Sequence, residues 1–444
     1  MNFAIRCFLY ILIFWLPYSP AVVEVCVVAA SILWLIKRSL FFFQTIRDNH
    51  RSANVFVASE TESFQRVIKS ARSAYFIVFI KSFRPIPTFL DVPILCFLAA
   101  ALLSLCGSFY FEQSFHGFLT KTLEWFIVYF LVVEVFNHNK YFNIFLGVLF
   151  FTSLAVGVDA ILQFYFLKKD IFLGRELARG GATAAFKHAN LLGGYMATII
   201  PVVLAAICAV PKVFVKVCLG CVLLILIWSL GITFSRGAWL GCLAGVLFFL
   251  YTLKRKIFVW GIFILILLIC GAGILLSQQT KTLLRLTADN IHDTMSWRLG
   301  VWEDSVKMIK DKPAFGHGVN TYMMLFQEYR RKYMGYADYS PTYAHNCYIQ
   351  LAAETGVFGL AAFLWIFLRL FKKVIAQTRE IGQNTTSSIF SIGLLSAVLT
   401  FLAHSAVDTN FYSLQISILF WILTGLLSAH VLVLETERSS PRDA

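Results

Sequence analysis

The chain has 444 residues, of which 59% are hydrophobic and only 14% are charged, and its formal net charge is +14. A soluble domain carries roughly 25% charged residues, so this composition excludes an ordinary soluble protein and favours a multi-span membrane protein. We attribute the basic excess to cytoplasmic loops and not to nucleic-acid binding, because Lys and Arg collect on the cytoplasmic side of a membrane.

Apolar runs long enough to cross the hydrocarbon core as helices recur along the whole chain. Their continuity excludes a β-barrel, whose strands alternate apolar and polar residues. The expected fold is an all-α polytopic membrane protein with about twelve spans, at 3–16, 21–36, 93–105, 123–136, 144–167, 191–210, 217–234, 238–253, 257–276, 348–371, 387–403 and 413–433. The stretch 109–119 is ambiguous and fits a re-entrant or interfacial helix.

Polarity divides the chain into regions: residues 1–276 with the first nine spans, a long polar loop at 277–346, residues 347–433 with the last three spans, and a cytoplasmic tail at 434–444. The segment 37–84, with nine basic and three acidic residues, is expected in the cytoplasm. Most Lys and Arg outside the long loop fall on that same side. The loop 168–190, Arg236 and the long loop then share the outer, periplasmic face, where the long loop is expected to be the catalytic one.

Two arginines on the expected outer face are candidate phosphate ligands. Arg236 lies at the junction of two apolar runs, within Phe-Ser-Arg-Gly. There it could be an interfacial anchor, or it could present a guanidinium fork beside free backbone N–H groups to phosphate oxygens. Arg298 lies on an expected amphipathic helix whose two tryptophans indicate the headgroup level. It could pair with Glu303 or Asp304 on a solvated face, or it could meet a lipid phosphate.

Histidines supply the candidate acid–base groups. His345 precedes the span that begins near residue 348, and histidine suits general-base work near neutral pH, although a lone histidine is more often structural. Asn346 can cap that helix. His317 lies between two glycines and is interpreted as a turn residue. His404 and Asp408, four residues apart, are interpreted as a hydrogen-bonded pair that positions its neighbours.

No metal or cofactor is expected. No His, Cys and carboxylate cluster has the spacing of metal ligands, and no Gly-rich nucleotide loop occurs in the sequence. The ten cysteines mostly lie inside apolar runs, where they are expected to act as small buried hydrophobic residues.

Several of these segments occur together in a recognisable order. The stretches 179–190, 234–239, 298–302, 313–322 and 345–359 resemble the O-antigen ligase/polymerase superfamily of bacterial polyprenyl-phosphate glycosyltransferases, and the similarity runs from about residue 174 to 421. The resemblance implies a GT-C-type fold of about twelve helices in the bacterial inner membrane and an active site facing the periplasm. It also implies a glycan donor on undecaprenyl diphosphate and a metal-independent, inverting transfer.

The essential groups of the family's ligases are two arginines and one histidine. Carried onto matching positions, they are Arg236 and Arg298 as diphosphate ligands and His345 as the catalytic base. Arg285 is a nearby rival for the second arginine. The resemblance leaves supporting roles open for Asn190, Asn346 and His317, and in this chain Ala189 stands where the family often has proline.

The resemblance does not choose the acceptor. Lipid A–core as acceptor makes the protein an O-antigen ligase, a second polyprenyl-linked glycan makes it a polymerase, and a protein hydroxyl makes it an oligosaccharyltransferase. One long external loop late in the chain favours the ligase, because the other external loop, 168–190, is short. A lipid-linked glycan transporter is the alternative from a different class. It requires a polar path through the spans, for which Asp159 and Glu134 are among the few candidates.

Overall fold

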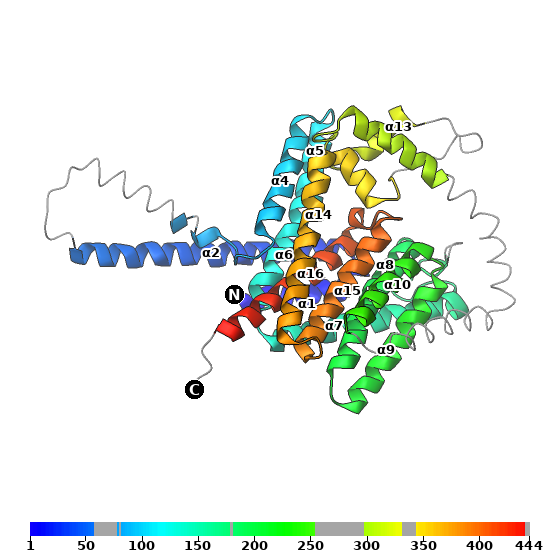
Figure 1. The fold of residues 1–444 in the computed structure, drawn as a ribbon, viewed down its shortest axis with the longest axis horizontal. Helices are drawn as coiled ribbons and strands as arrows, with labels where there is room; N and C mark the ends of the chain where they lie inside the picture. Colours follow the sequence, from blue (N-terminus) through cyan, green and yellow to red (C-terminus); the bar gives the residue numbers. More distant parts are fainter. Residues whose placement is uncertain (57–77, 80, 178–180, 254–296, 331–342, 440–444) are drawn as a thin grey trace.

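The computed structural model describes residues 1–56, 78–79, 81–177, 181–253, 297–330 and 343–439. Within these ranges its regular structure is helical, apart from one isolated bridge between Lys169 and Glu176 (Figure 1). Seven helices in the described ranges are long and apolar enough to cross a membrane, and three shorter apolar helices accompany them. The described parts are therefore helical and consistent with a multi-pass membrane protein, as the composition predicts.

The helices follow one another along the chain as α1 (Asn2–Trp15), α2 (Pro20–Phe56), α4 (Asp91–Cys106), α5 (Phe111–Gly117), η1 (Phe118–Leu123), α6 (Glu124–Val135), α7 (Asn139–Leu162), η2 (Gln163–Leu167), α8 (Ala189–Ala209), α9 (Val213–Ile232), α10 (Arg236–Thr252), α13 (Tyr322–Tyr329), α14 (Cys347–Ile381), α15 (Thr386–Ser405), η3 (Asn410–Tyr412) and α16 (Leu414–Ser439). A further helical run covers 297–311. It confirms the amphipathic helix that the sequence predicts around Arg298.

Most predicted spans coincide with helices of the structure within a few residues. The predicted span 257–276 and Arg285 lie outside the described residues, as does much of the predicted long loop. The number of twelve spans, the domain boundaries and the loop's extent therefore stay predictions.

Helix α2 does not end where the second predicted apolar span ends, at residue 36. Helix α2 continues to Phe56 and projects away from the body of the molecule (Figure 1). The apolar run stops at Lys37, but the next twenty residues contain neither Gly nor Pro, so nothing in the backbone ends the helix there. Hydropathy reports where the apolar run ends, and the helix itself ends elsewhere.

The ambiguous stretch 109–119 belongs to a longer rod. Helix α5 runs without a break through the π-helical segment η1 into α6, so 111–135 forms one continuous helical element. π-Helical turns widen a helix locally and often occur near functional sites. A second one, η2, extends α7 to Leu167.

Helix α16 lies at the centre of the bundle. Its apolar window is 89% buried, against 22% for the peripheral helices α2 and α9. Trp421 of α16 is fully buried and packs edge-to-face on Phe126, with ring centroids 4.7 Å apart. Aromatic residues of α14, α15 and η3 surround it, so the core is a cluster of large rings around this one helix.

A stripe of small residues joins α10 to α15. A Cβ atom on Gly237 would lie 2.7 Å from Val407, one on Gly241 2.7 Å from the Thr400 carbonyl, and one on Gly245 1.9 Å from Thr400 Oγ1. Small residues four positions apart let membrane helices approach closely. This packing brings the first turn of α10, and with it Arg236, against the 404–408 segment.

Helix α14 is kinked at Gly356, whose φ of +71° is a left-handed conformation that suits glycine. The loop 313–318 fills the break: the N–H of Val357 donates to the Pro313 carbonyl at 2.8 Å, and the N–H of Gly318 donates to the Glu354 carbonyl at 2.9 Å. Two segments that carry the family resemblance, 313–322 and 345–359, are thus joined backbone to backbone.

Candidate functional site

Arg236 is the first residue of α10, and its side chain is exposed. The chain turns sharply before it, with Phe234 at a φ of +54°. The first N–H groups of a helix have no partner within the helix and favour anions. Arg236 therefore combines a guanidinium group with a helix N-terminus, which is the arrangement expected of a phosphate ligand.

Arg298 lies close enough to Arg236 for their charges to interact. Its Nη1 donates to the Val407 carbonyl at 2.9 Å, and its Nε is buried with no hydrogen-bond partner among the described residues. Burial lowers the pKa of Arg298, Asp408 raises it, and the positive charge of Arg236 lowers it further. Two guanidinium groups at close quarters suit a ligand with two negative charges, such as a diphosphate.

His345 stands beside both the 297–311 helix and Asp408. Its Nδ1 is 3.7 Å from Asp408 Oδ1, and its ring lies 5.3 Å from that of Trp297 in an edge-to-face arrangement. The next turn of the same helix holds the preceding residue, because Trp302 Nε1 donates to the Ala344 carbonyl at 2.9 Å. His345 has a φ of +50°, a backbone conformation that histidine tolerates and that occurs often at functional sites.

Asp408 contacts two histidines. Besides His345, its carboxylate stands 3.9 Å from His404 Nε2, so the predicted pair is in contact but at a distance longer than a hydrogen bond. Burial alone raises the pKa of Asp408, but His345, His404 and the N–H of Thr409 outweigh burial and lower the pKa to about 2. The group is therefore a carboxylate at every physiological pH, and it can orient a neighbouring imidazole.

Two of the supporting candidates have local roles. Asn346 caps α14, accepting from the N–H groups of Tyr348 at 2.9 Å and Ile349 at 3.1 Å, as the sequence predicts. His317 is the predicted turn residue, between glycines with φ of +70° and +109°. Its ring is buried, with Nε2 3.0 Å from the Met308 carbonyl. Asn190 lies half-buried in the first turn of α8.

The sequence reasoning overlooked His188, which is the N-cap residue of α8. Burial lowers its pKa, as do the charges of Lys187 and Arg175, whereas Asp408 raises it. A third histidine, besides His345 and His404, thus lies within electrostatic range of Asp408. His188 belongs to the stretch 179–190 that carries part of the resemblance. Its position two residues before Asn190 could have marked it as a candidate site residue.

Glu354 hydrogen-bonds to several segments that surround the candidate site. Its buried carboxylate accepts from the Asn320 N–H at 2.8 Å, from Tyr412 Oη at 3.0 Å and from Gln350 Nε2 at 3.2 Å. Gln350 Oε1 in turn accepts the N–H of Ala344, next to His345, at 3.0 Å. One buried group therefore fixes the loop before α13, the η3 turn and the entrance to α14 relative to one another.

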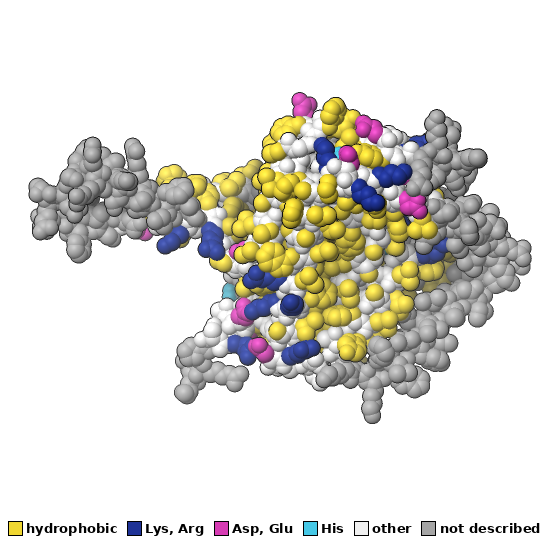
Figure 2. All heavy atoms as spheres, turned by 45° about the horizontal axis from the view of Figure 1, so that its top comes forward, with side chains coloured by type: hydrophobic (Ala, Val, Ile, Leu, Met, Phe, Trp, Pro, Cys, Tyr) yellow, Lys and Arg dark blue, Asp and Glu magenta, His cyan; other side chains and the backbone are white. Residues whose placement is uncertain are grey.

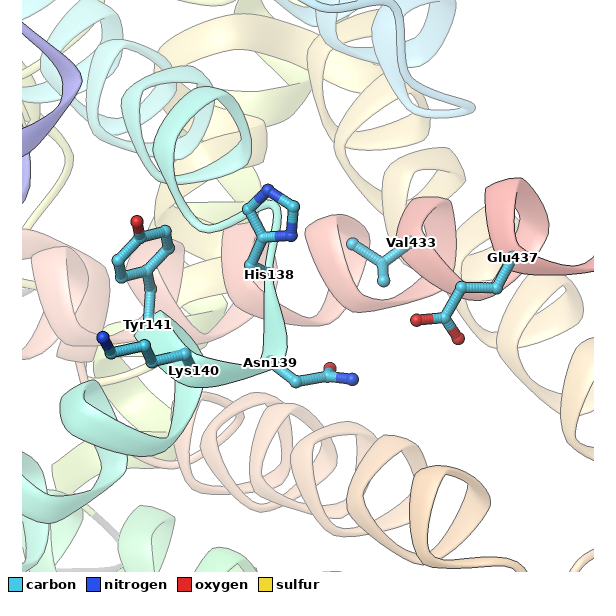
Figure 3. Close-up of a pocket in the computed structure, with 6 residues that line it drawn as sticks. All are labelled: His138, Asn139, Lys140, Tyr141, Val433 and Glu437. Carbon is cyan, nitrogen blue, oxygen red and sulfur yellow. The ribbon is translucent and has the colours of Figure 1, made fainter. Parts of the chain in front are cut away.

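Two cavities in the described parts lie away from this cluster. One of about 400 Å³ lies between the 138–141 turn that begins α7 and Val433 and Glu437 of α16 (Figure 3). Val433 is nineteen residues beyond the start of α16, roughly 28 Å along the helix at 1.5 Å per residue. Among the described residues, no three His, Cys, Asp or Glu side chains are grouped so as to hold a metal ion.

Comparison with known protein families gives one result. The family model described as O-antigen ligase, Wzy_C, matches residues 221–364. No curated protein matches the chain. The matched stretch contains Arg236, Arg298 and His345, together with the 313–322 loop and the kink that it fills. The resemblance to the O-antigen ligase superfamily is confirmed, and residues 221–364, about a third of the chain, match its O-antigen ligase domain.

Proposed function

We propose that the protein is an O-antigen ligase-type glycosyltransferase that moves a glycan from undecaprenyl diphosphate to a sugar hydroxyl of lipid A–core. The reaction takes place at the periplasmic face of the bacterial inner membrane, in a GT-C-like bundle of twelve spans. One observation carries the proposal: three separate parts of the chain meet at residues 407–408. Arg298 bonds to Val407, His345 lies beside Asp408, and Gly237, next to Arg236, packs against Val407.

The arginines bind the donor's diphosphate. Undecaprenyl diphosphate leaves readily once its charge is neutralised, and the attraction of Arg236 and Arg298 grows as negative charge develops on the departing oxygen. The unpartnered Nε of Arg298 and the free N–H groups at the start of α10 are donors available to phosphate oxygens.

His345 accepts the proton of the attacking sugar hydroxyl. Asp408 faces Nδ1, so the imidazole carries its proton there and leaves Nε2 free to act as the base. The separation of 3.7 Å tightens to a hydrogen bond when the substrate is bound, as catalytic contacts often do. Because the base and the diphosphate lie on opposite faces of the anomeric carbon, the transfer inverts its configuration.

A transporter of lipid-linked glycans is the alternative of a different class, and the buried acids do not favour it. Glu134 is ion-paired with Lys37 and Arg38, and Asp159 accepts the N–H of Ile171 at 2.8 Å. Each carboxylate therefore has at least one partner, although Asp159 Oδ2 is buried without one among the described residues. A polymerase and a protein O-oligosaccharyltransferase share the proposed site and differ only in the acceptor.

Transfer by the purified protein tests the proposal. The protein in detergent is given undecaprenyl-diphosphate glycan with lipid A–core, with a second polyprenyl-linked glycan, or with an acceptor protein, each with and without EDTA. We expect product with lipid A–core, undiminished by EDTA. If product forms only with another acceptor, the reaction is reassigned to that acceptor. If EDTA abolishes transfer and magnesium or manganese restores it, the arginine mechanism is contradicted. If no acceptor gives product, the transporter is favoured.

A further inference from the structure

A second charged site lies at the other end of the bundle. A cavity of about 290 Å³ is lined by Arg38 of α2, by Lys81 and Arg84, and by the 85–87 segment. The start of α2 adjoins the start of α16, because Gln415 Nε2 donates to the Leu16 and Pro17 carbonyls. Arg38 is eighteen residues further along α2, roughly 27 Å at 1.5 Å per residue, so the cavity lies far from the candidate active site.

The cavity has an excess of positive charge and an unused donor. Lys37 and Arg38 pair with the buried carboxylate of Glu134, and the Arg38 guanidinium lies 5.3 Å from the Trp34 ring. These contacts hold Arg38 in place, yet its Nε is buried with no partner among the described residues. Lys81 and Arg84 are both exposed and have no described ion-pair partner.

Hydrophobic side chains surround these basic groups. Phe79 packs on Phe42 with ring centroids 5.7 Å apart and on Phe83 at 4.8 Å, which holds the 81–84 segment against α2. Phe41, Phe43 and Phe79 are 52%, 65% and 47% exposed. Figure 2 shows Lys and Arg side chains gathered where α2 leaves the body, beside hydrophobic side chains. An anion bound here is therefore next to a surface that suits acyl chains.

We propose that this cavity binds the headgroup of an anionic phospholipid such as phosphatidylglycerol. Lys81 and Arg84 attract the phosphate, the Nε of Arg38 donates to one of its oxygens, and the acyl chains lie on the exposed phenylalanines. The adjacent apolar surface favours a lipid over a free phosphate ion, which would leave that surface bare. The proposal is independent of the glycan-transfer reaction.

Native mass spectrometry of the purified full chain tests this site with two probes, phosphatidylglycerol and phosphatidylcholine. We expect one tightly bound phosphatidylglycerol, bound at least tenfold more tightly than phosphatidylcholine. Lys81→Gln with Arg84→Gln should weaken phosphatidylglycerol binding roughly 30-fold, because the variant loses the electrostatic attraction of two basic residues to the anionic headgroup. Lys212→Gln with Lys216→Gln, at the N-cap and in the first turn of α9, is the matched control and should leave binding unchanged.

Two results overturn the proposal: equal binding of the two lipids by the wild-type protein, or equal phosphatidylglycerol binding by the wild-type protein and the Lys81/Arg84 variant. The charge-preserving variant Lys81→Arg with Arg84→Lys guards against a folding defect. It should bind phosphatidylglycerol within a few-fold of the wild type and show the same lipid-induced rise in Tm. Loss of binding in this variant also contradicts the proposal, because a headgroup site of this kind depends on charge.

Discussion

At the scale of single residues, the ionisation of Asp408 leads to the most specific mechanistic prediction. Its pKa of about 2 lies below the ordinary value of about 3.9, so the stability that its ionised form contributes is present above pH 4 and is lost only as pH falls towards 2. Asp408 therefore contributes no limb to an activity profile near neutral pH.

Replacing Asp408 by Asn removes the negative charge that faces His345. We expect kcat to fall about tenfold or more, and the acidic limb of the pH profile to move to lower pH, because an opposite charge beside an imidazole favours its charged form. Asp408→Glu should restore part of the rate. A carboxylate that only holds the 406–412 turn predicts a lower Tm with the limb unmoved, and that pattern would remove Asp408 from the mechanism.

The two arginines make the second residue-level prediction. Arg236→Ala and Arg298→Ala should each lower transfer by about 10²–10³-fold, the effect of removing a donor to developing charge, while the protein still reaches the membrane. Lysine at either position should rescue poorly, because an ammonium group cannot form a bidentate fork. Transfer assays on membrane-extracted protein measure both.

Lys310→Ala, an exposed substitution on the same 297–311 helix, is the matched control and should keep full activity. Full activity of either arginine variant removes that residue from the site. If Arg285→Ala proves inactive and Arg298→Ala active, the second diphosphate ligand is Arg285.

Local patterns predicted the local roles of residues. The cap at Asn346 and the turn at His317 follow from residue type and immediate neighbours, and the structure confirms both. The contact between His345 and Asp408 joins residues 63 positions apart, and no local pattern encodes such a contact. The resemblance pointed to His345, but only the fold brings Asp408 to its Nδ1.

Among the helices, close packing of α10 on α15 holds Arg236 in position, and Gly241 tests it. A Cβ at Gly241 would lie 2.7 Å from the Thr400 carbonyl, so Gly241→Val should lower stability by about 1–3 kcal/mol, as overpacking does, and should reduce transfer by shifting Arg236. Thermal unfolding in detergent measures the first effect. Gly220→Val on α9, where a Cβ meets nothing within 4 Å, should change neither, and equal losses in the two variants contradict this packing argument.

Hydropathy predicted where most helices lie, because crossing a membrane demands a long apolar run. It did not predict features that depend on contacts. Helix α2 continues past its apolar run, and α14 extends through a kink whose backbone groups bond to a loop 36 to 44 residues earlier in the chain. The sequence shows a glycine at 356, but only the fold shows the 313–318 loop that packs into the kink there.

For the whole molecule, the orientation in the membrane is the prediction on which the mechanism depends. In a cysteine-free background, single cysteines at Lys187, beside the candidate site, and within 297–330 should react with a membrane-impermeant reagent added from the periplasmic side. Cysteines at Lys212 and at Lys254 should react only after the membrane is opened. The reverse pattern would put the arginines in the cytoplasm and end the proposal of periplasmic transfer.

The most direct test of the account as a whole is the pH profile of donor-saturated transfer by the wild-type protein and by His345→Gln, measured beside donor binding. The account predicts that the variant loses about 10²–10⁴-fold in rate, the usual contribution of a general base. It should also lose the acidic limb and bind undecaprenyl-diphosphate glycan as tightly as the wild type, because the arginines hold the diphosphate. A variant that keeps the wild-type acidic limb in its remaining activity would contradict the account, and His188, a further histidine within electrostatic range of Asp408, would be the next candidate for the base.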